Sequence, residues 1–139
     1  MVEVMVACLV LATIALTAAA SIQYARSMSV VQRDRRTALE MANSRLEDAR
    51  GAAYASVRPS SSNYNAYYVS RTGSAWRVTA GNPNETTKVN GRSRPITTTV
   101  QYVDVDGGSA SYDCIRLWVS VQYSANASNL VILETLKSP

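Results

Sequence analysis

The sequence contains no histidine, no phenylalanine and only two cysteines. Without histidine, the most frequent acid–base catalyst and the most frequent metal ligand of proteins are both excluded. Cys8 lies in an apolar run and Cys114 lies far along the polar part, so we expect no intramolecular disulfide. No nucleophile–base pair can be assembled from the remaining residues. We therefore expect a protein that is not an enzyme and carries no cofactor.

Charged residues are scarce, at 17% of the 139 residues, and the net charge is only +4. Residues 26–50 carry six arginines against four acids, and residues 51–139 carry eight basic against five acidic side chains. A surface so mildly and diffusely basic does not by itself indicate nucleic-acid binding.

Glycine and proline are both missing before Gly51, which removes the two residues least compatible with a helix. Residues 26–50 are instead rich in good helix formers. We therefore predict one continuous helix from the N-terminal region to about Ala53, about 80 Å long. Its second half is amphipathic, because apolar side chains recur at three- and four-residue spacing. This stripe consists of Leu39, Ala42, Leu46, Ala49 and Ala53.

The first half of this helix is apolar nearly all round. No residue from Val4 to Ala25 is charged, and about 20 such residues suffice to cross a bilayer as a helix. Glu3 stands at the start of the run. A carboxylate inside lipid is costly and usually functional, whereas one in the headgroup layer is favoured by the helix dipole, and spacing alone leaves both open. A removed secretory signal is a further alternative, since alanines 18–20 resemble a cleavage site, although the start is acidic where a signal is basic.

After Pro59 the sequence changes to turns and short strands. The runs 67–71 and 75–79 flank a Thr-Gly-Ser turn and predict a β-hairpin. The polar stretch Gly81–Pro95 predicts a long surface loop. Three further strands are predicted at Ile96–Val105, Tyr112–Tyr123 and Leu130–Lys137.

The order of these elements predicts an α+β fold, in which a long N-terminal helix packs by its second half on a small antiparallel sheet. We expect three parts: a hydrophobic membrane or filament-core helix at 1–25, an amphipathic spine at 26–54 and an antiparallel β-sheet head at 55–139. The middle strand of the last three alternates well. Its apolar face is formed by Ile115, Leu117, Val119, Val121 and Tyr123.

The segment Val2-Glu-Val-Met-Val-Ala7 resembles the N-terminal motif of type IV pilins and type II secretion pseudopilins, in which an apolar helix carries one early glutamate. Residues 36–47 are similar to the second half of the spine in V-type minor pilins and I-type minor pseudopilins. The runs 115–123 and 131–136 are similar to the closing strand pair of that subgroup. The family's helix-breaking proline is absent, with Ala20 in that region, so we expect little loss of helicity on assembly.

This resemblance implies a subunit that resides in the bacterial inner membrane and is then assembled into a periplasmic or extracellular filament. Glu3 would pair with the N-terminal amine of a neighbouring subunit and set the axial register, although it lies two positions nearer the start than the family's glutamate. The implied partners are other pilin subunits, identical or different, a prepilin peptidase and an assembly platform. The resemblance also implies a basic leader ending in glycine and an N-methylated first residue. Helix packing is expected of Val4, Met5, Cys8, Leu9, Leu11, Ile14 and Leu16.

Three aspartates are a candidate metal site. Asp104, Asp106 and Asp113 flank a Gly-Gly turn and offer hard oxygen ligands to Ca²⁺. Their spacing does not match an EF-hand loop, and aspartates beside such a turn are ordinary turn residues. We therefore expect no metal.

Basic and aromatic residues around the hairpin and the long loop are candidate contacts for DNA or a surface ligand. Such a cluster can bind phosphates and stack bases, although a solvated surface explains it better at this low net charge. Its members are Trp76, Arg77, Arg92 and Arg94, with Arg71 and Lys88 close in sequence.

The sequence as a whole predicts a structural, pilin-like filament subunit, most like a minor pilin or pseudopilin that initiates or caps a filament. One alternative is a major subunit of a long extracellular filament, which would dominate preparations of sheared filaments. The other is a membrane-anchored module that binds DNA or a surface ligand, and its retention on DNA would be sensitive to salt.

Overall fold

The computed structural model describes residues 1–59, 66–73, 75–103 and 114–138, which form two compact units, Met1–Arg33 and Asp34–Pro139. Helix α1 (Val2–Gly51) contributes to both units and is followed by the short helix α2 (Tyr54–Val57). The prediction of one long N-terminal helix is confirmed. It ends at Gly51, two residues before the predicted end.

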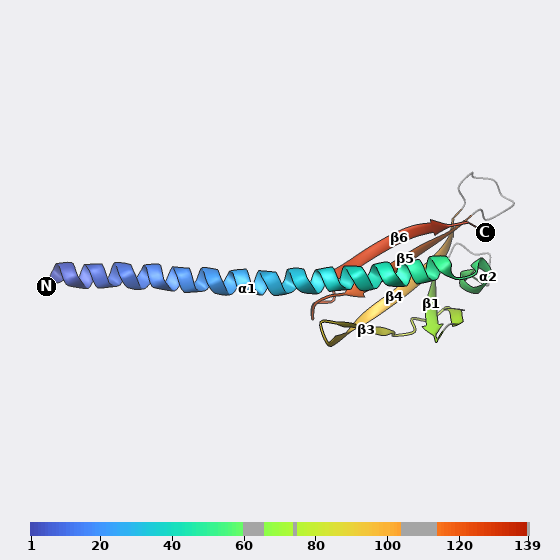
Figure 1. Cartoon of the computed structure of the whole chain (residues 1–139), viewed down its shortest axis with the longest axis horizontal. Coiled ribbons are helices and arrows are strands. Elements are labelled where there is room, and N and C mark those ends of the chain that lie inside the picture. The colour runs from blue at the N-terminus through green and yellow to red at the C-terminus, as the bar shows by residue number, and fades with distance from the viewer. Residues whose placement is uncertain (60–65, 74, 104–113, 139) are drawn as a thin grey trace. The chain divides into compact units, whose positions relative to one another are not determined.

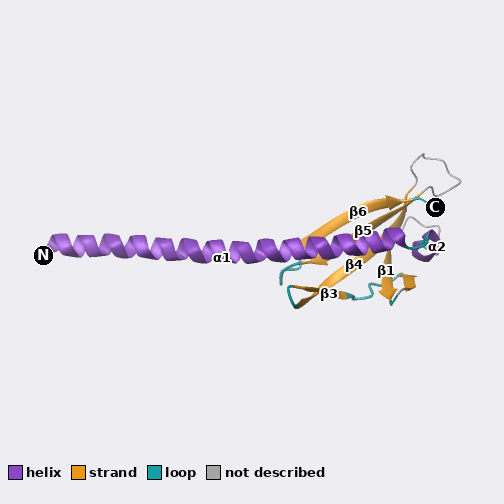
Figure 2. Ribbon diagram, viewed as in Figure 1, coloured by secondary structure: helices purple, strands orange, loops and turns teal. Residues whose placement is uncertain are grey.

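The second unit contains a six-stranded antiparallel sheet, and all of its strands follow the helices in the chain (Figure 2). The sheet order is β2-β1-β4-β5-β6, with β3 paired to the first part of β4. In Figure 1 the C-terminal part of α1 lies along one face of this sheet, which confirms the α+β prediction. The strands are β1 (Tyr67–Thr72), β2 (Ala75–Thr79), β3 (Thr86–Val89), β4 (Arg92–Val103), β5 (Cys114–Gln122) and β6 (Leu130–Lys137).

The core lies between this sheet face and α1. Alternate residues of β5 point into it, and Ile115, Leu117, Val119 and Val121 are fully buried, as their spacing predicts. The buried stripe of α1 runs through Ala38, Ala42, Leu46 and Ala49. Small alanines at three of these positions let the helix backbone approach the sheet closely.

The predicted stripe is wrong at its two ends. Leu39 remains 47% exposed and Ala53 is also exposed, whereas Ala38 is fully buried. Ala38 is four residues before Ala42 and shares its face, whereas Leu39 lies at the edge of the stripe, about 100° from Ala38 around the helix. Ala53 lies beyond the helix end and has no helical face.

The predicted surface loop Gly81–Pro95 is wrong in its second half. Strand β3 and the start of β4 pair there in register, Lys88 with Ser93 and Val89 with Arg92. The turn between them is Asn90-Gly91, and both residues have positive φ, 48° and 78°. A two-residue Asn-Gly turn with positive φ closes a β-hairpin in the sense that suits the strand twist. The dipeptide is thus a hairpin signal that the polar composition of the stretch obscured.

The end of the last strand caps the end of the long helix. The ammonium group of Lys137 donates hydrogen bonds to the carbonyl oxygens of Ala49, at 3.4 Å, and of Arg50 and Ala52. The last carbonyls of a helix have no partner within it, and a cation there also complements the helix dipole. Burial lowers the pKa of Lys137, and neighbouring Arg50 lowers it further.

We expect Lys137→Met to reduce the free energy of unfolding by about 1–2 kcal/mol, because it leaves these carbonyls without a partner. Urea unfolding of the full chain in mild detergent measures this through fluorescence, since both tryptophans, Trp76 and Trp118, lie in the sheet. Lys88→Met is the matched control. Lys88 is exposed, so an equal loss in both variants would show that the cap contributes nothing.

Candidate functional site

The apolar side chains of the first unit are all exposed. Six of the seven residues expected to pack between helices retain 58–74% of their accessible surface, and Cys8 is exposed as well. The helix is long and apolar enough to cross a membrane, with a mean hydropathy of 2.3 in its most apolar window and none of that window buried. An apolar surface of this size requires lipid or other protein chains to cover it. The six residues are Val4, Met5, Leu9, Leu11, Ile14 and Leu16.

The threonine and serine hydroxyl groups of this apolar segment are satisfied within the helix itself. Thr13 Oγ1 donates to the carbonyl oxygen of Val10 at 2.8 Å, Thr17 Oγ1 to that of Thr13 at 3.0 Å, and Ser21 Oγ to that of Thr17 at 2.8 Å. An unsatisfied polar group in hydrocarbon costs several kcal/mol. The threonine and serine hydroxyls of the segment would therefore not be left unpaired in an apolar environment.

Glu3 occupies the first turn of α1 and is exposed. Within the described part of the chain, its carboxylate has no hydrogen-bond or ion-pair partner. The positive end of the helix dipole favours a negative charge at this position. When the adjacent apolar surface is covered, this charge needs either water or a cation supplied from outside the chain.

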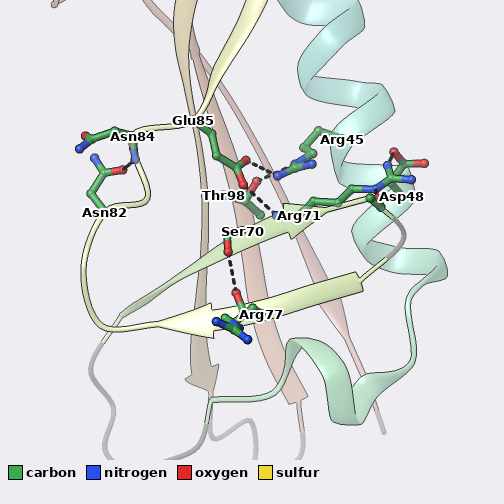
Figure 3. A network of polar contacts seen from close by, with 10 residues as sticks. Arg45, Asp48, Ser70, Arg71, Arg77, Asn82, Asn84, Glu85 and Thr98 are labelled. Carbon is green, nitrogen blue, oxygen red and sulfur yellow. Dashed lines mark hydrogen bonds and ion pairs between the residues drawn. The ribbon is translucent and has the colours of Figure 1, made fainter.

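In the second unit, a network of charged side chains joins α1 to the sheet (Figure 3). The Glu85 carboxylate forms an ion pair with Arg45 of α1 through one oxygen and accepts the backbone N–H of Arg71 through the other, at 2.8 Å. Arg45 also donates through Nε to Thr98 Oγ1 at 3.3 Å, and the Arg71 guanidinium pairs with Asp48. Burial lowers the pKa of Arg45 and the Glu85 carboxylate opposes this effect, but an arginine remains cationic at physiological pH.

Trp76 completes this network. The guanidinium carbons of Arg45 and Arg71 lie 4.7 and 5.7 Å from the centre of its ring. A cleft of about 350 Å³ lies beside these groups, lined by Met41, Ile96 and the same charged residues among others. Each of the two arginines has an acidic partner within the chain. The arrangement is therefore suited to fastening the helix to the sheet, and it leaves no unpaired charge aimed at a ligand.

The structure separates the residues predicted to form one basic–aromatic cluster. Trp76 stacks beside Arg45, whereas Arg92 adjoins the β3–β4 turn, whose Asn90 contacts Asp34. Arg45 and Asp34 are eleven residues apart on α1, about 16 Å of helix. Arg77 is exposed beside Trp76 on β2, and Arg94 is half-buried on β4. The four residues do not form a single stacking and phosphate-binding surface.

The three aspartates considered as candidate calcium ligands, Asp104, Asp106 and Asp113, lie outside the described residues. Across the ranges that the structure does describe, no group of three or more Cys, Asp and Glu side chains is placed to hold a metal ion.

The sequence patterns did not indicate a role for Arg45, Asp48 or Glu85. Arg45 and Asp48 each precede a buried stripe residue, Leu46 and Ala49, which is the one local sign that they border the sheet. Glu85 stands in the stretch predicted to be a surface loop, and nothing in the sequence around it indicates a partner 40 residues away.

Comparisons of the chain with protein-family models, with curated proteins and with solved structures find no match.

Proposed function

We propose that this protein is a structural subunit of a type IV pilus-like filament, most like a minor pilin or pseudopilin. The observation that carries the proposal is the apolar segment of α1, which is uncharged from Val4 to Ala25, exposed throughout, and preceded at once by an unpaired carboxylate at Glu3. A plain membrane anchor explains the apolar surface but gives the carboxylate no specific partner.

In the proposed filament, the apolar segments of neighbouring subunits pack against one another and exclude lipid. Small residues such as Ala12, Ala15 and Ala19 allow close approach of helix backbones, which favours association where hydrophobic burial adds little. Before assembly, the same surface holds the subunit in the inner membrane. A prepilin peptidase and an assembly platform would process the subunit and lift it from the bilayer.

Glu3 supplies the axial register of this packing. A buried carboxylate is tolerated when it is paired with an opposite charge, and the N-terminal amine of an adjacent subunit is a cation at the matching depth. Apolar helices can otherwise slide along one another at little cost. A single buried polar contact that is satisfied in only one alignment fixes the register.

We expect Glu3→Ala to lower incorporation into sheared filaments several-fold while insertion into the inner membrane is unchanged, because the apolar segment is intact but its register contact is lost. Immunoblots of filament and membrane fractions measure both quantities. Glu40→Ala is the matched control, since Glu40 is an exposed glutamate of the same helix.

Equal incorporation of the Glu3→Ala variant and the wild type would remove Glu3 from the mechanism. Failure of the wild-type chain to enter any filament fraction would contradict the proposed function itself and favour a membrane-anchored module.

A further inference from the structure

Four of the basic residues of the second unit that have no acidic partner lie on two segments that tertiary contacts bring together. Arg35, Arg36, Lys88 and Arg92 are all exposed, and none has an ion pair within the described part of the chain. Arg45, Arg50, Arg71 and Arg116 are by contrast each paired with a carboxylate. We refer to Arg35, Arg36, Lys88 and Arg92 as the basic surface.

Tertiary contacts bring the two halves of the basic surface together. Asn90, in the β3–β4 turn, donates through Nδ2 to Asp34 Oδ1 at 2.5 Å and accepts from Thr37 Oγ1 at 3.3 Å. Lys88 and Arg92 flank this turn on β3 and β4. The hairpin is thereby held against the turn of α1 that contains Arg35 and Arg36.

The charge balance of these two segments is strongly positive. Residues 26–39 contain four arginines and a single acid, Asp34, and residues 86–95 contain three basic residues and no acid. Glu40 follows one helical turn after Arg36. Asp34 is hydrogen-bonded to a neutral amide, and it forms no ion pair with any of the four residues of the basic surface.

Arg35 and Arg36 follow soon after the apolar run in the chain. Asp34 follows Ala25, the last residue of the apolar run, by nine residues, about 14 Å of helix. The headgroup layer occupies about 5–8 Å of that length on each side of a bilayer. The length of helix beyond the headgroup layer is comparable to the Debye length of about 8–10 Å, within which anionic lipids attract basic side chains.

We propose that the basic surface binds the anionic phospholipid headgroups of the membrane in which the apolar segment is anchored. This inference rests on the membrane stage of the proposed function and not on filament assembly. The attraction helps to hold the unassembled subunit at the bilayer, and it is given up when the subunit leaves the membrane.

The two lysines of the sequence provide a direct test on the full, unmodified chain. Lys88 belongs to the basic surface, whereas Lys137 is engaged at the end of α1 and serves as an internal reference. The chain is reconstituted in vesicles of phosphatidylcholine alone and in vesicles that also contain phosphatidylglycerol. Acylation of each lysine by an amine-reactive reagent is then followed by peptide mass spectrometry.

We expect anionic vesicles to slow acylation of Lys88 about fivefold relative to Lys137, the factor expected for one basic residue near an anionic surface. High salt should remove this protection. The triple variant Arg35→Gln, Arg36→Gln and Arg92→Gln should also lose it, because its remaining charge attracts lipid weakly. The matched triple variant Arg50→Gln, Arg58→Gln and Arg77→Gln, made at exposed arginines elsewhere, should retain it.

Equal acylation of Lys88 in both kinds of vesicle, with the protein floating with both, would overturn the proposal and leave the membrane anchor intact. Protection of Lys88 by short duplex DNA but not by anionic lipid would overturn it in favour of nucleic acid. Failure to float with neutral vesicles would overturn the membrane anchor together with the inference.

Discussion

The substitution Leu117→Ala should reduce the free energy of unfolding by about 3–4 kcal/mol. Leu117 is fully buried at the centre of β5, between β4 and β6 and beneath the buried face of α1. Loss of its side chain removes apolar burial and leaves a cavity that the strands on either side cannot close. Small domains are stabilised by only about 5–15 kcal/mol, so the loss is a large part of the total.

Urea unfolding of the full chain in mild detergent, followed by tryptophan fluorescence, measures this change. Ile132→Ala is the control, because Ile132 lies on the adjacent strand β6 and is 60% exposed. We expect the control to cost less than about 1 kcal/mol. If the two variants unfold at the same urea concentration, the core does not lie on the face of the sheet to which Leu117 points.

The second large effect is expected for Glu85→Ala, at about 2–3 kcal/mol. Its carboxylate is the acceptor for both the Arg45 guanidinium and the backbone N–H of Arg71. Without it, two guanidinium groups remain close together beside Trp76, and the side chain of Arg45 is only 14% exposed. A partly buried charge that loses its partner cannot recover full hydration. Most of the desolvation cost of the Arg45 guanidinium is then no longer offset and lowers the free energy of unfolding.

Glu134→Ala is the matched control for this experiment. Glu134 pairs with Arg116 at 2.9 Å, but both side chains are about half exposed, and surface pairs of this kind contribute about 0–1 kcal/mol. Glu85→Gln should give an intermediate loss, because the amide oxygen still accepts a hydrogen bond. Equal stability of the Glu85→Ala and Glu134→Ala variants would show that the network does not fasten the helix to the sheet.

Much of the fold was predictable because its signals are local. The hairpin of β1 and β2, the alternation of β5 and the bounds of β6 follow the expected runs closely. The failures occur where two local signals competed. The polar composition of residues 81–95 favoured a loop, although the Asn-Gly turn between β3 and β4 is a hairpin signal. The large apolar side chain of Leu39 led to its inclusion in the predicted buried stripe, although the buried residue is Ala38, one position earlier.

The candidate site was predictable to a different extent in each unit. The apolar run and Glu3 can be read directly from the sequence, because a membrane-length helix needs no contact with the rest of the chain to be recognised. The charged network in the second unit could not be read in this way. Glu85 forms an ion pair with Arg45, which is 40 residues away in the chain. The sequence around a single charged residue does not identify so distant a partner.

By itself, the sequence determined the long helix, its uncharged first half and the presence of a strand-rich head, because periodicity and composition act over a few neighbouring residues. Only the tertiary structure decided which charges are neutralised. It paired Arg45 and Arg71 with acids, placed Lys137 on the end of α1, and held the β3–β4 turn, which Lys88 and Arg92 flank, against Asp34. Such pairings depend on strand register and on the approach of helix to sheet, which bring together side chains that are far apart in the chain.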